Sequence, residues 1–421
     1  MNLFIKTKLR KINKFYFIND RILKLLILFL FSLSFRILVF GTFVLSSPEK
    51  MVLQMSEATG GNPFYPPGYY IFYNLFISLD YGLAPGIIFQ YAVDSFIAVL
   101  IVLISEIIFK KRYYFIGYLY SINLLTSLYA SFYKPETLYA LFIILSLYFI
   151  LVYLKNNNNL FFFLSIISFC LSNYIRPNSL YMIPFISIIF LYKKQFYKFF
   201  IFNIIFILLI SPNIIYNKVN YDELSFATIQ EYNLYHYEMP VTMFIKEVGY
   251  ITYFWEMIKP GGGYTYDLIN KQTNELATKY NCLTNKEKVK ISIKYIINNP
   301  IPWLYSHFVG IFQIYRPITH LHYVNTLLNI TDYTYLLTPL IFITTIMPFL
   351  FIIFIIKYRK SIDRITLILI LFIILFLSFI PGFLADIRFR ITLEPLLYLF
   401  GGYVLLKFII LIKKFKINLH K

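Results

Sequence analysis

Long apolar runs alternate with short polar connections along almost the whole chain. A helix needs about 20 mainly apolar residues to cross a bilayer, and about ten runs approach or reach that length. We expect spanning helices near residues 22–46, 87–108, 114–132, 137–154, 160–174, 178–192, 199–215, 333–356, 365–382 and 391–412. The pattern predicts an all-α, polytopic membrane protein with about ten transmembrane helices.

Two further segments predict helices that lie at the membrane surface. Residues 67–79 are apolar but too short to span, and they start with a Pro-Pro-Gly sequence. Residues 285–315 carry apolar side chains at mixed helical spacing, together with Trp303, which is typical of an interfacial amphipathic helix. The second segment belongs to a larger external loop region, 216–332, in which Gly261-Gly262-Gly263 breaks the helical pattern.

The basic residues predict the orientation of the chain. Lys and Arg gather in every second connection, and such connections face the cytoplasm. These clusters are Lys110-Lys111-Arg112, Lys155, Lys193-Lys194, Lys357 to Arg364 and Lys413 to Lys421. An even number of spans then places both basic ends, 1–21 and 413–421, in the cytoplasm. The remaining connections face outward. We expect an N-terminal membrane region, 22–215, that contains the first external loop, 47–86, and a C-terminal membrane region, 333–412, after the external loop region 216–332.

Composition supports a membrane protein and changes how the positive charge is interpreted. The chain is 59% hydrophobic and 14% charged, with a formal net charge of +19. The basic residues lie in short loops and tails beside apolar runs, which orients a protein among anionic lipids and disfavours nucleic acid as a partner. Cys170 and Cys282 form no disulfide framework.

Three stretches on the expected external side carry candidate chemistry. They are Gly60 to Tyr69 (GGNPFYPPGY), Glu136 to Tyr139 (ETLY) followed by Ile175 to Leu180 (IRPNSL), and Asp386 to Leu397 (DIRFRITLEPLL). In this order they resemble the integral-membrane glycosyltransferases of the GT-C class, specifically the family 39-like enzymes related to protein O-mannosyltransferases and lipid A aminoarabinose transferases. The resemblance implies a GT-C-like fold. It also implies transfer of a sugar from a polyprenyl-phosphate donor to a glycan, lipid or protein acceptor, with inversion at the anomeric carbon. The reaction would take place on the face of the cell (inner) membrane that lies outside the cytoplasm.

The resemblance also implies roles for individual residues. A carboxylate in the first external loop would take the proton of the acceptor, and the acids available there are Glu49, nearer to the expected position, and Glu57. Arg176, Arg388 and Arg390 would contact the lipid phosphate, because guanidinium groups bind phosphate oxygens bidentately. Further candidate substrate-binding residues are Tyr65, Tyr69 and Glu136.

Each role has an ordinary structural alternative. Glu49 beside Lys50 is also the pattern of a solvated pair, and Glu136 that of a carboxylate at a helix N-terminus. External arginines also anchor to headgroups or pair with acids such as Asp386 and Glu394. No metal ligand is assigned, since His320 and His322 lack a partner at useful spacing, although a divalent ion is a candidate cofactor. Other functions left open are a polysaccharide polymerase, a flippase-type transporter and a non-catalytic assembly protein.

Overall fold

The computed structural model describes residues 20–41, 63–77, 84–258, 271–276, 278, 280, 283–316, 334–385 and 387–419. Within these ranges the chain is all-helical and contains no strand, as the apolar pattern predicts. Six described helices are long and apolar enough to cross a membrane, namely Asp20–Gly41, α3 (Ala84–Phe109), α6 (Glu136–Asn156), α9 (Phe196–Tyr221), Thr338–Ser361 and Glu394–Phe415. The last two belong to α17 (Thr334–Ile353) with its continuation through η5 (Phe354–Tyr358) and η6 (Arg359–Ser361), and to α20 (Glu394–Leu419).

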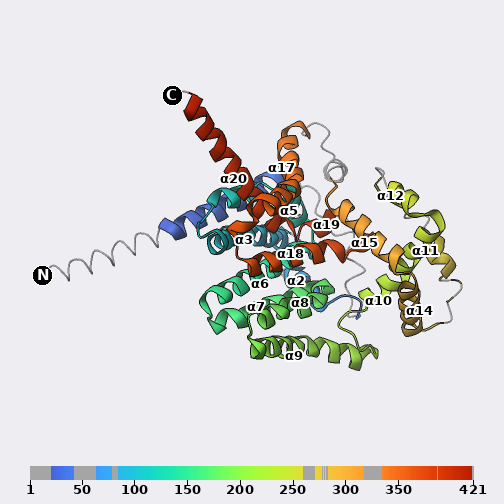
Figure 1. Ribbon diagram of the computed structural model, residues 1–421. Helices are drawn as coiled ribbons and strands as arrows, with labels where there is room; N and C mark the ends of the chain where they lie inside the picture. The colour runs from blue at the N-terminus through green and yellow to red at the C-terminus, as the bar shows by residue number, and fades with distance from the viewer. Residues whose placement is uncertain are drawn as a thin grey trace.

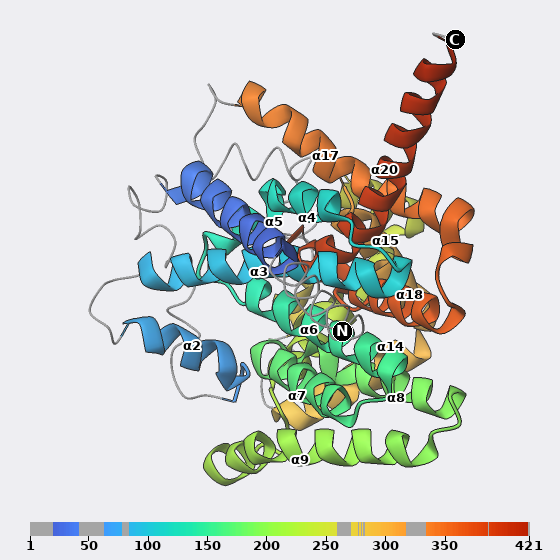
Figure 2. The ribbon, with the colours of Figure 1, turned by 90° about the vertical axis from the view of Figure 1, so that its left-hand side faces the viewer.

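Three shorter apolar helices accompany them. They are α7 (Asn159–Ile175), η3 (Pro177–Met182) with α8 (Ile183–Tyr192), and α18 (Arg364–Phe379). Figure 2 shows α9 at one edge of this bundle, with α17 and α20 at the opposite edge. In the most apolar stretch of α3 and of α6, 67% is buried inside the protein. In α9 and Asp20–Gly41 the corresponding shares are 22% and 17%. The large apolar faces that remain exposed on the two outer helices need lipid to cover them.

One expected span, 114–132, is divided into two short helices. These are α4 (Tyr114–Ser121) and α5 (Leu124–Ala130). Asn123 causes the break, because its side chain caps the first turn of α5 and its amide donates a hydrogen bond to Glu394 Oε2 at 2.8 Å. Residues 114–132 therefore form two helices that meet at a polar junction inside the bundle, and not one continuous helix.

A buried ion pair fastens the first helix to the bundle. Arg36 donates to Asp94 Oδ2 from Nε at 2.8 Å and from Nη2 at 2.5 Å, and both side chains are almost fully buried. Tyr120 donates to the other oxygen of Asp94 at 2.6 Å. The three residues come from Asp20–Gly41, α3 and α4, so the network joins three helices. Asp94 thus has its charge and hydrogen bonds satisfied within the fold.

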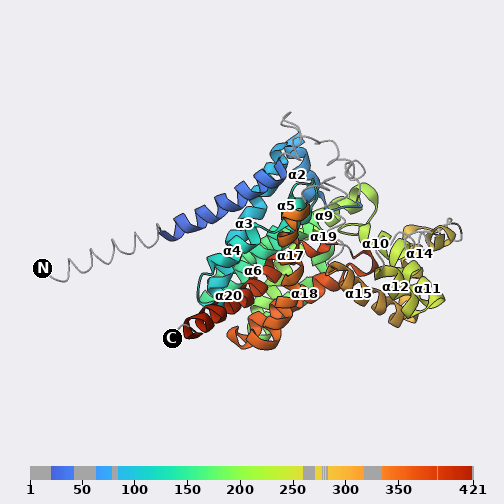
Figure 3. The same ribbon diagram turned by 90° about the horizontal axis from the view of Figure 1, so that it is seen from above.

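A second group of helices projects from one side of the bundle, and we call it the α10–α15 region. It contains α10 (Ile229–Asn233), η4 (Leu234–Glu238), α11 (Met239–Val248), α12 (Tyr250–Ile258), α14 (Asn285–Asn298) and α15 (Pro300–Ile314). Pro300 divides the expected 285–315 helix in two. In Figures 1 and 3 this region lies at one side, and the start of the first helix and the end of α20 lie at the other. Both ends of the described chain therefore leave the bundle on the side opposite to the α10–α15 region.

Candidate functional site

Glu136 and Arg176 meet on the side of the bundle that faces the α10–α15 region. Glu136 is the first residue of α6, and Arg176 directly follows α7. Because Pro177 comes next, Arg176 adopts an extended backbone and the helix ends there. Arg176 Nη2 lies 3.0 Å from Glu136 Oε1, and the two side chains are 16% and 2% exposed. Two residues predicted from separate stretches therefore form one nearly buried ion pair.

The Phe389 ring contacts both Arg176 and a second arginine, Arg388. It lies in α19 (Ile387–Arg390), a single turn that follows α18 and η7 (Gly382–Leu384). The Cζ atoms of Arg176 and Arg388 lie 5.2 and 5.1 Å from the centroid of the Phe389 ring, within the range of a cation–π contact. Guanidinium groups from two distant parts of the sequence thus converge on one aromatic ring.

Glu136 keeps one acceptor atom for another partner. Its second oxygen, Oε2, is buried and accepts no hydrogen bond from the residues that the structure describes. A buried oxygen without a donor is unfavourable by about 1–3 kcal/mol. A hydroxyl group supplied by a substrate would satisfy it, which makes this position chemically suited to binding.

Tyr69, in α2 (Pro67–Ile77), lies close to Glu136. Its hydroxyl donates to Gln90 Oε1 at 3.3 Å, and Gln90 in turn donates to the carbonyl oxygens of Ala130 and Phe132. Burial raises the pKa of Tyr69 well above its usual value, and the nearby Glu136 carboxylate raises that pKa further. The phenol is therefore neutral and serves as a hydrogen-bond donor beside the Glu136–Arg176 pair.

Tyr65 lies farther out, in the segment before α2. Its side chain is 47% exposed, and its ring packs edge-on against Phe64 at 4.7 Å. Gly68 lets α2 approach α7 closely, because a Cβ at this position would lie 2.6 Å from the carbonyl oxygen of Tyr174. This part of the first predicted loop, 47–86, is thereby held against α7, the helix that precedes Arg176.

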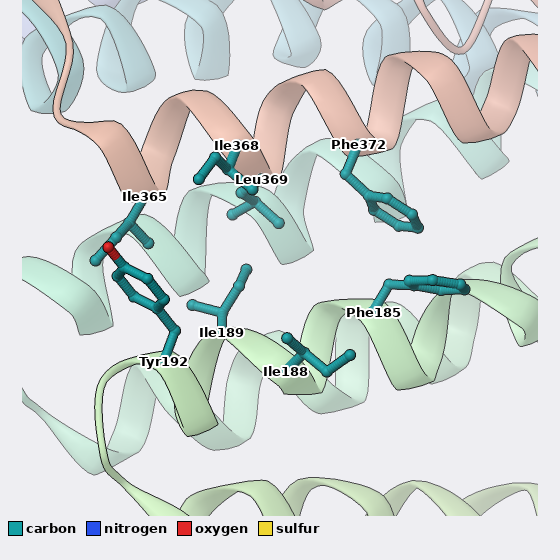
Figure 4. Close-up of a pocket in the computed structure, with 8 residues that line it drawn as sticks. All are labelled: Phe185, Ile188, Ile189, Tyr192, Ile365, Ile368, Leu369 and Phe372. Carbon is teal, nitrogen blue, oxygen red and sulfur yellow. The ribbon is translucent and has the colours of Figure 1, made fainter.

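An apolar groove opens between α8 and α18 (Figure 4). Its volume is about 200 Å³, and its lining surface is entirely apolar. Figure 4 shows the side chains of α8 and α18 facing each other across it, with Phe185 and Phe372 stacked at 4.7 Å toward one end. The residues that line it are Phe185, Ile188, Ile189, Tyr192, Ile365, Ile368, Leu369 and Phe372. At the end that faces the α10–α15 region, α8 leads back through η3 to Arg176, and α18 leads through η7 to Arg388.

Arg390 differs from the other predicted phosphate contacts. Its side chain is fully buried, with Nε hydrogen-bonded to Glu394 and Nη2 to the carbonyl oxygen of Thr344. Glu394 also accepts the hydrogen bond from Asn123, so the pair joins α17, α20 and the α4–α5 junction. This geometry favours a role in holding the bundle together over contact with a phosphate, because α19 turns Arg390 inward while Arg388 is half-buried beside Phe389.

A histidine that the sequence did not single out connects this site to the α10–α15 region. His307 of α15 lies 3.0 Å from Glu238 Oε2 through Nε2, and 2.7 Å from the carbonyl oxygen of Phe379 through Nδ1. The Trp303 indole donates to the same Glu238 oxygen at 2.8 Å. We call Glu238, Trp303 and His307 the histidine clamp. It holds α15 against the end of α18, just before the turn that carries Arg388.

Several predicted residues lie outside the described ranges. These are Glu49, Glu57, Asp386, His320 and His322. In the described part of the chain no group of three or more His, Cys, Asp or Glu side chains is arranged to hold a metal ion. The catalytic base and the divalent ion therefore stay predictions from the sequence.

Among the residues that do contribute, Phe389, Gln90 and the histidine clamp were not predicted. Phe389 stands inside the third stretch, where two flanking arginines are the only signal that it could be a shared cation–π partner.

Comparison of the chain with protein-family models, with curated proteins and with solved structures finds no match.

Proposed function

We propose that this protein is a membrane glycosyltransferase that uses a polyprenyl-phosphate-linked sugar as donor, with a GT-C-like arrangement of about ten membrane helices. The observation that carries the proposal is the convergence of Arg176 and Arg388 on the Phe389 ring. Two guanidinium groups at the end of a membrane helix bundle suit an anionic phosphate whose attached lipid stays in the bilayer.

The apolar groove supports a donor with a long hydrocarbon chain. The two elements that line it, α8 and α18, lead to the two arginines at the end facing the α10–α15 region. A lipid phosphate with its head at Arg176 and Arg388 would run its chain along this groove. Because the groove is as apolar as the lipid tails around it, it can take their place against such a chain.

The reaction requires few parts. The acceptor hydroxyl oxygen attacks the anomeric carbon, the bond from that carbon to the phosphate oxygen breaks, and the polyprenyl phosphate leaves with the bonding electrons. A carboxylate takes the hydroxyl proton, for which Glu49 and then Glu57 are the proposed bases. Arg176 and Arg388 stabilise the negative charge that develops on the leaving phosphate. Attack from the face opposite to the phosphate inverts the anomeric carbon.

The proposal is tested with purified protein in lipid nanodiscs and labelled polyprenyl-phosphate sugars. We expect Arg388→Ala to reduce transfer and to weaken binding of unmodified polyprenyl phosphate, with Arg388→Lys restoring only part of both because the planar fork is lost. Arg364→Ala is the matched control, since Arg364 is exposed at the opposite end of α18. Arg388→Ala with wild-type donor binding and transfer, at normal protein levels, would remove the arginine pair from the site.

A further inference from the structure

A small cavity lies between α10, η4 and α14 of the α10–α15 region. Its volume is about 90 Å³. The backbone amides of Thr228 and Ile229 donate to the carbonyl oxygens of Pro63 and Phe64 at 2.9 and 3.0 Å, so this part of the first predicted loop is held against the start of α10. The cavity therefore takes part of its wall from the loop to which the proposed catalytic base belongs.

Gln230, the residue before Glu231, connects α10 to the segment that follows Arg176. The Gln230 amide donates to the carbonyl oxygen of Pro177, the residue after Arg176, at 3.2 Å. Its side-chain oxygen accepts from the Tyr181 hydroxyl at 2.9 Å. These two bonds hold α10 on η3, the element that follows Arg176, and the side chain of the next residue, Glu231, lines the cavity.

One wall of the cavity is aromatic. The Phe64 and Tyr232 rings pack edge to face at 5.3 Å, and the Tyr232 and His236 rings stack at 4.0 Å. Tyr232 remains 39% exposed. The negative face of an aromatic ring attracts the positively polarised C–H groups of a ligand.

The remaining wall carries polar groups of different kinds. The carboxylate of Glu231 forms no hydrogen bond or ion pair with another described residue, and burial followed by the charge of Glu223 raises its pKa more than the charge of Lys286 lowers it. Lys288 and Asn285 approach from α14, with the Lys288 ammonium 5.5 Å above the Tyr235 ring. A carboxylate only accepts, an ammonium only donates, and an amide does both.

These groups select a neutral ligand that is rich in hydroxyls. Because Glu231 and Lys288 carry opposite charges, neither a net anion nor a net cation meets only favourable charges in the cavity. Closely spaced hydroxyls donate to the carboxylate and accept from the ammonium and the amide, and a ring bearing them presents C–H groups to the aromatic wall. We propose that this cavity binds one sugar ring, with Glu231 accepting hydrogen bonds from its hydroxyls. The inference rests on the proposed function, in which a sugar arrives either on the acceptor or on the lipid-linked donor.

The test uses the full chain in nanodiscs and a panel of methyl glycosides, methyl glucoside, galactoside, mannoside and N-acetylglucosaminide, observed by saturation-transfer NMR. We expect at least one glycoside to bind, and Glu231→Gln to weaken that binding about 10–100-fold, as loss of a charged hydrogen bond does. Tyr232→Leu should weaken it as well. Glu275→Gln, at an exposed residue outside the cavity, is the matched control. Absence of glycoside binding, or equal binding by folded Glu231→Gln and Tyr232→Leu proteins, would overturn the inference.

Two further arms separate the sources of the sugar and the two proposals. Displacement of the glycoside by a polyprenyl-phosphate sugar assigns the ring to the donor, whereas simultaneous binding assigns it to the acceptor. If no glycoside binds but Arg388→Ala still impairs donor use, the cavity assignment fails and the proposed function stands. If glycosides bind as expected but the wild-type protein transfers no sugar from any donor, the proposed function fails and the cavity assignment stands.

Discussion

The histidine clamp makes the attachment of the α10–α15 region dependent on pH. Both ring nitrogens of His307 face acceptors, the Phe379 carbonyl oxygen at 2.7 Å and a Glu238 carboxylate oxygen at 3.0 Å. Only the doubly protonated imidazolium donates to both. Burial lowers the pKa of His307, but the hydrogen bond and charge of Glu238, with the Phe379 carbonyl, raise it more, so the pKa lies above its ordinary value.

The stabilisation by the clamp follows from that direction. Because the folded pKa is raised, the contribution is complete below the ordinary value of about 6.5 and is lost as the pH rises through the folded pKa. Glu238→Ala would leave the Trp303 and His307 N–H groups without their shared acceptor, at about 1–3 kcal/mol each. Since both charged side chains are at least 88% buried, we expect a total loss of about 3–5 kcal/mol. Glu238→Gln keeps an oxygen in place and should cost roughly 1 kcal/mol.

Trp303 provides a direct assay, because it donates to Glu238 and the chain has only one other tryptophan, Trp255. In a Trp255→Phe background we expect Trp303 emission and the unfolding midpoint to change together on the alkaline side of about pH 6.5. Glu238→Gln should remove that change. His236→Gln is the control, since burial and then Lys288 lower the pKa of His236, so its titration affects only the acidic side. A Glu238→Gln protein with the wild-type alkaline profile would refute the clamp.

Three other predictions concern the base, the buried charge and the packing of α15. Glu49→Gln should reduce transfer by about 10²–10⁴-fold while donor binding persists, with a milder effect for Glu57→Gln; near-normal turnover in a labelled-donor assay would exclude Glu49. Asp94→Leu should destabilise the protein by about 3–5 kcal/mol by leaving Arg36 buried without its partner, and adding Arg36→Met should recover much of the unfolding midpoint. Gly310→Ala should destabilise by roughly 1–3 kcal/mol, because a Cβ there would lie 2.1 Å from the backbone of η7; an unchanged midpoint would contradict this close packing.

The sequence predicts the membrane helices better than it predicts their interruptions. Apolar runs are local, so α3, α6, α9 and α20 can be recognised from their own residues. At the break, Asn123 caps α5 and donates a hydrogen bond to Glu394, which is 271 positions away in the chain. A single Asn in an apolar run gives no indication of such a partner, which is why one continuous helix was expected over 114–132.

Prediction of the site from the sequence was likewise incomplete, because contacts of single side chains depend on residues far apart in the chain. Proline after Arg176 and the acid at the start of α6 marked two helix ends, and those ends do meet in an ion pair. Arg388 and Arg390 could not be told apart from sequence, because both stand in one short polar stretch. Residues two apart on a helical turn point in different directions, so one lies beside Phe389 and the other enters the core.

Burial and pairing separate Arg36 and Arg390 from Arg176 and Arg388. Arg36 and Arg390 are fully buried, and each is bound to an acid that also accepts a hydrogen bond from a third helix or junction. Removing either charge would leave its partner acid buried and unpaired, so these two arginines stabilise the bundle. Arg176 remains 16% exposed, and its partner Glu136 retains a buried oxygen with no donor among the described residues. That oxygen can accept a hydrogen bond from a ligand hydroxyl. Arg176 and Arg388 are partly exposed and share the Phe389 ring, so we propose these two for the phosphate, whereas the buried Arg390 serves the fold.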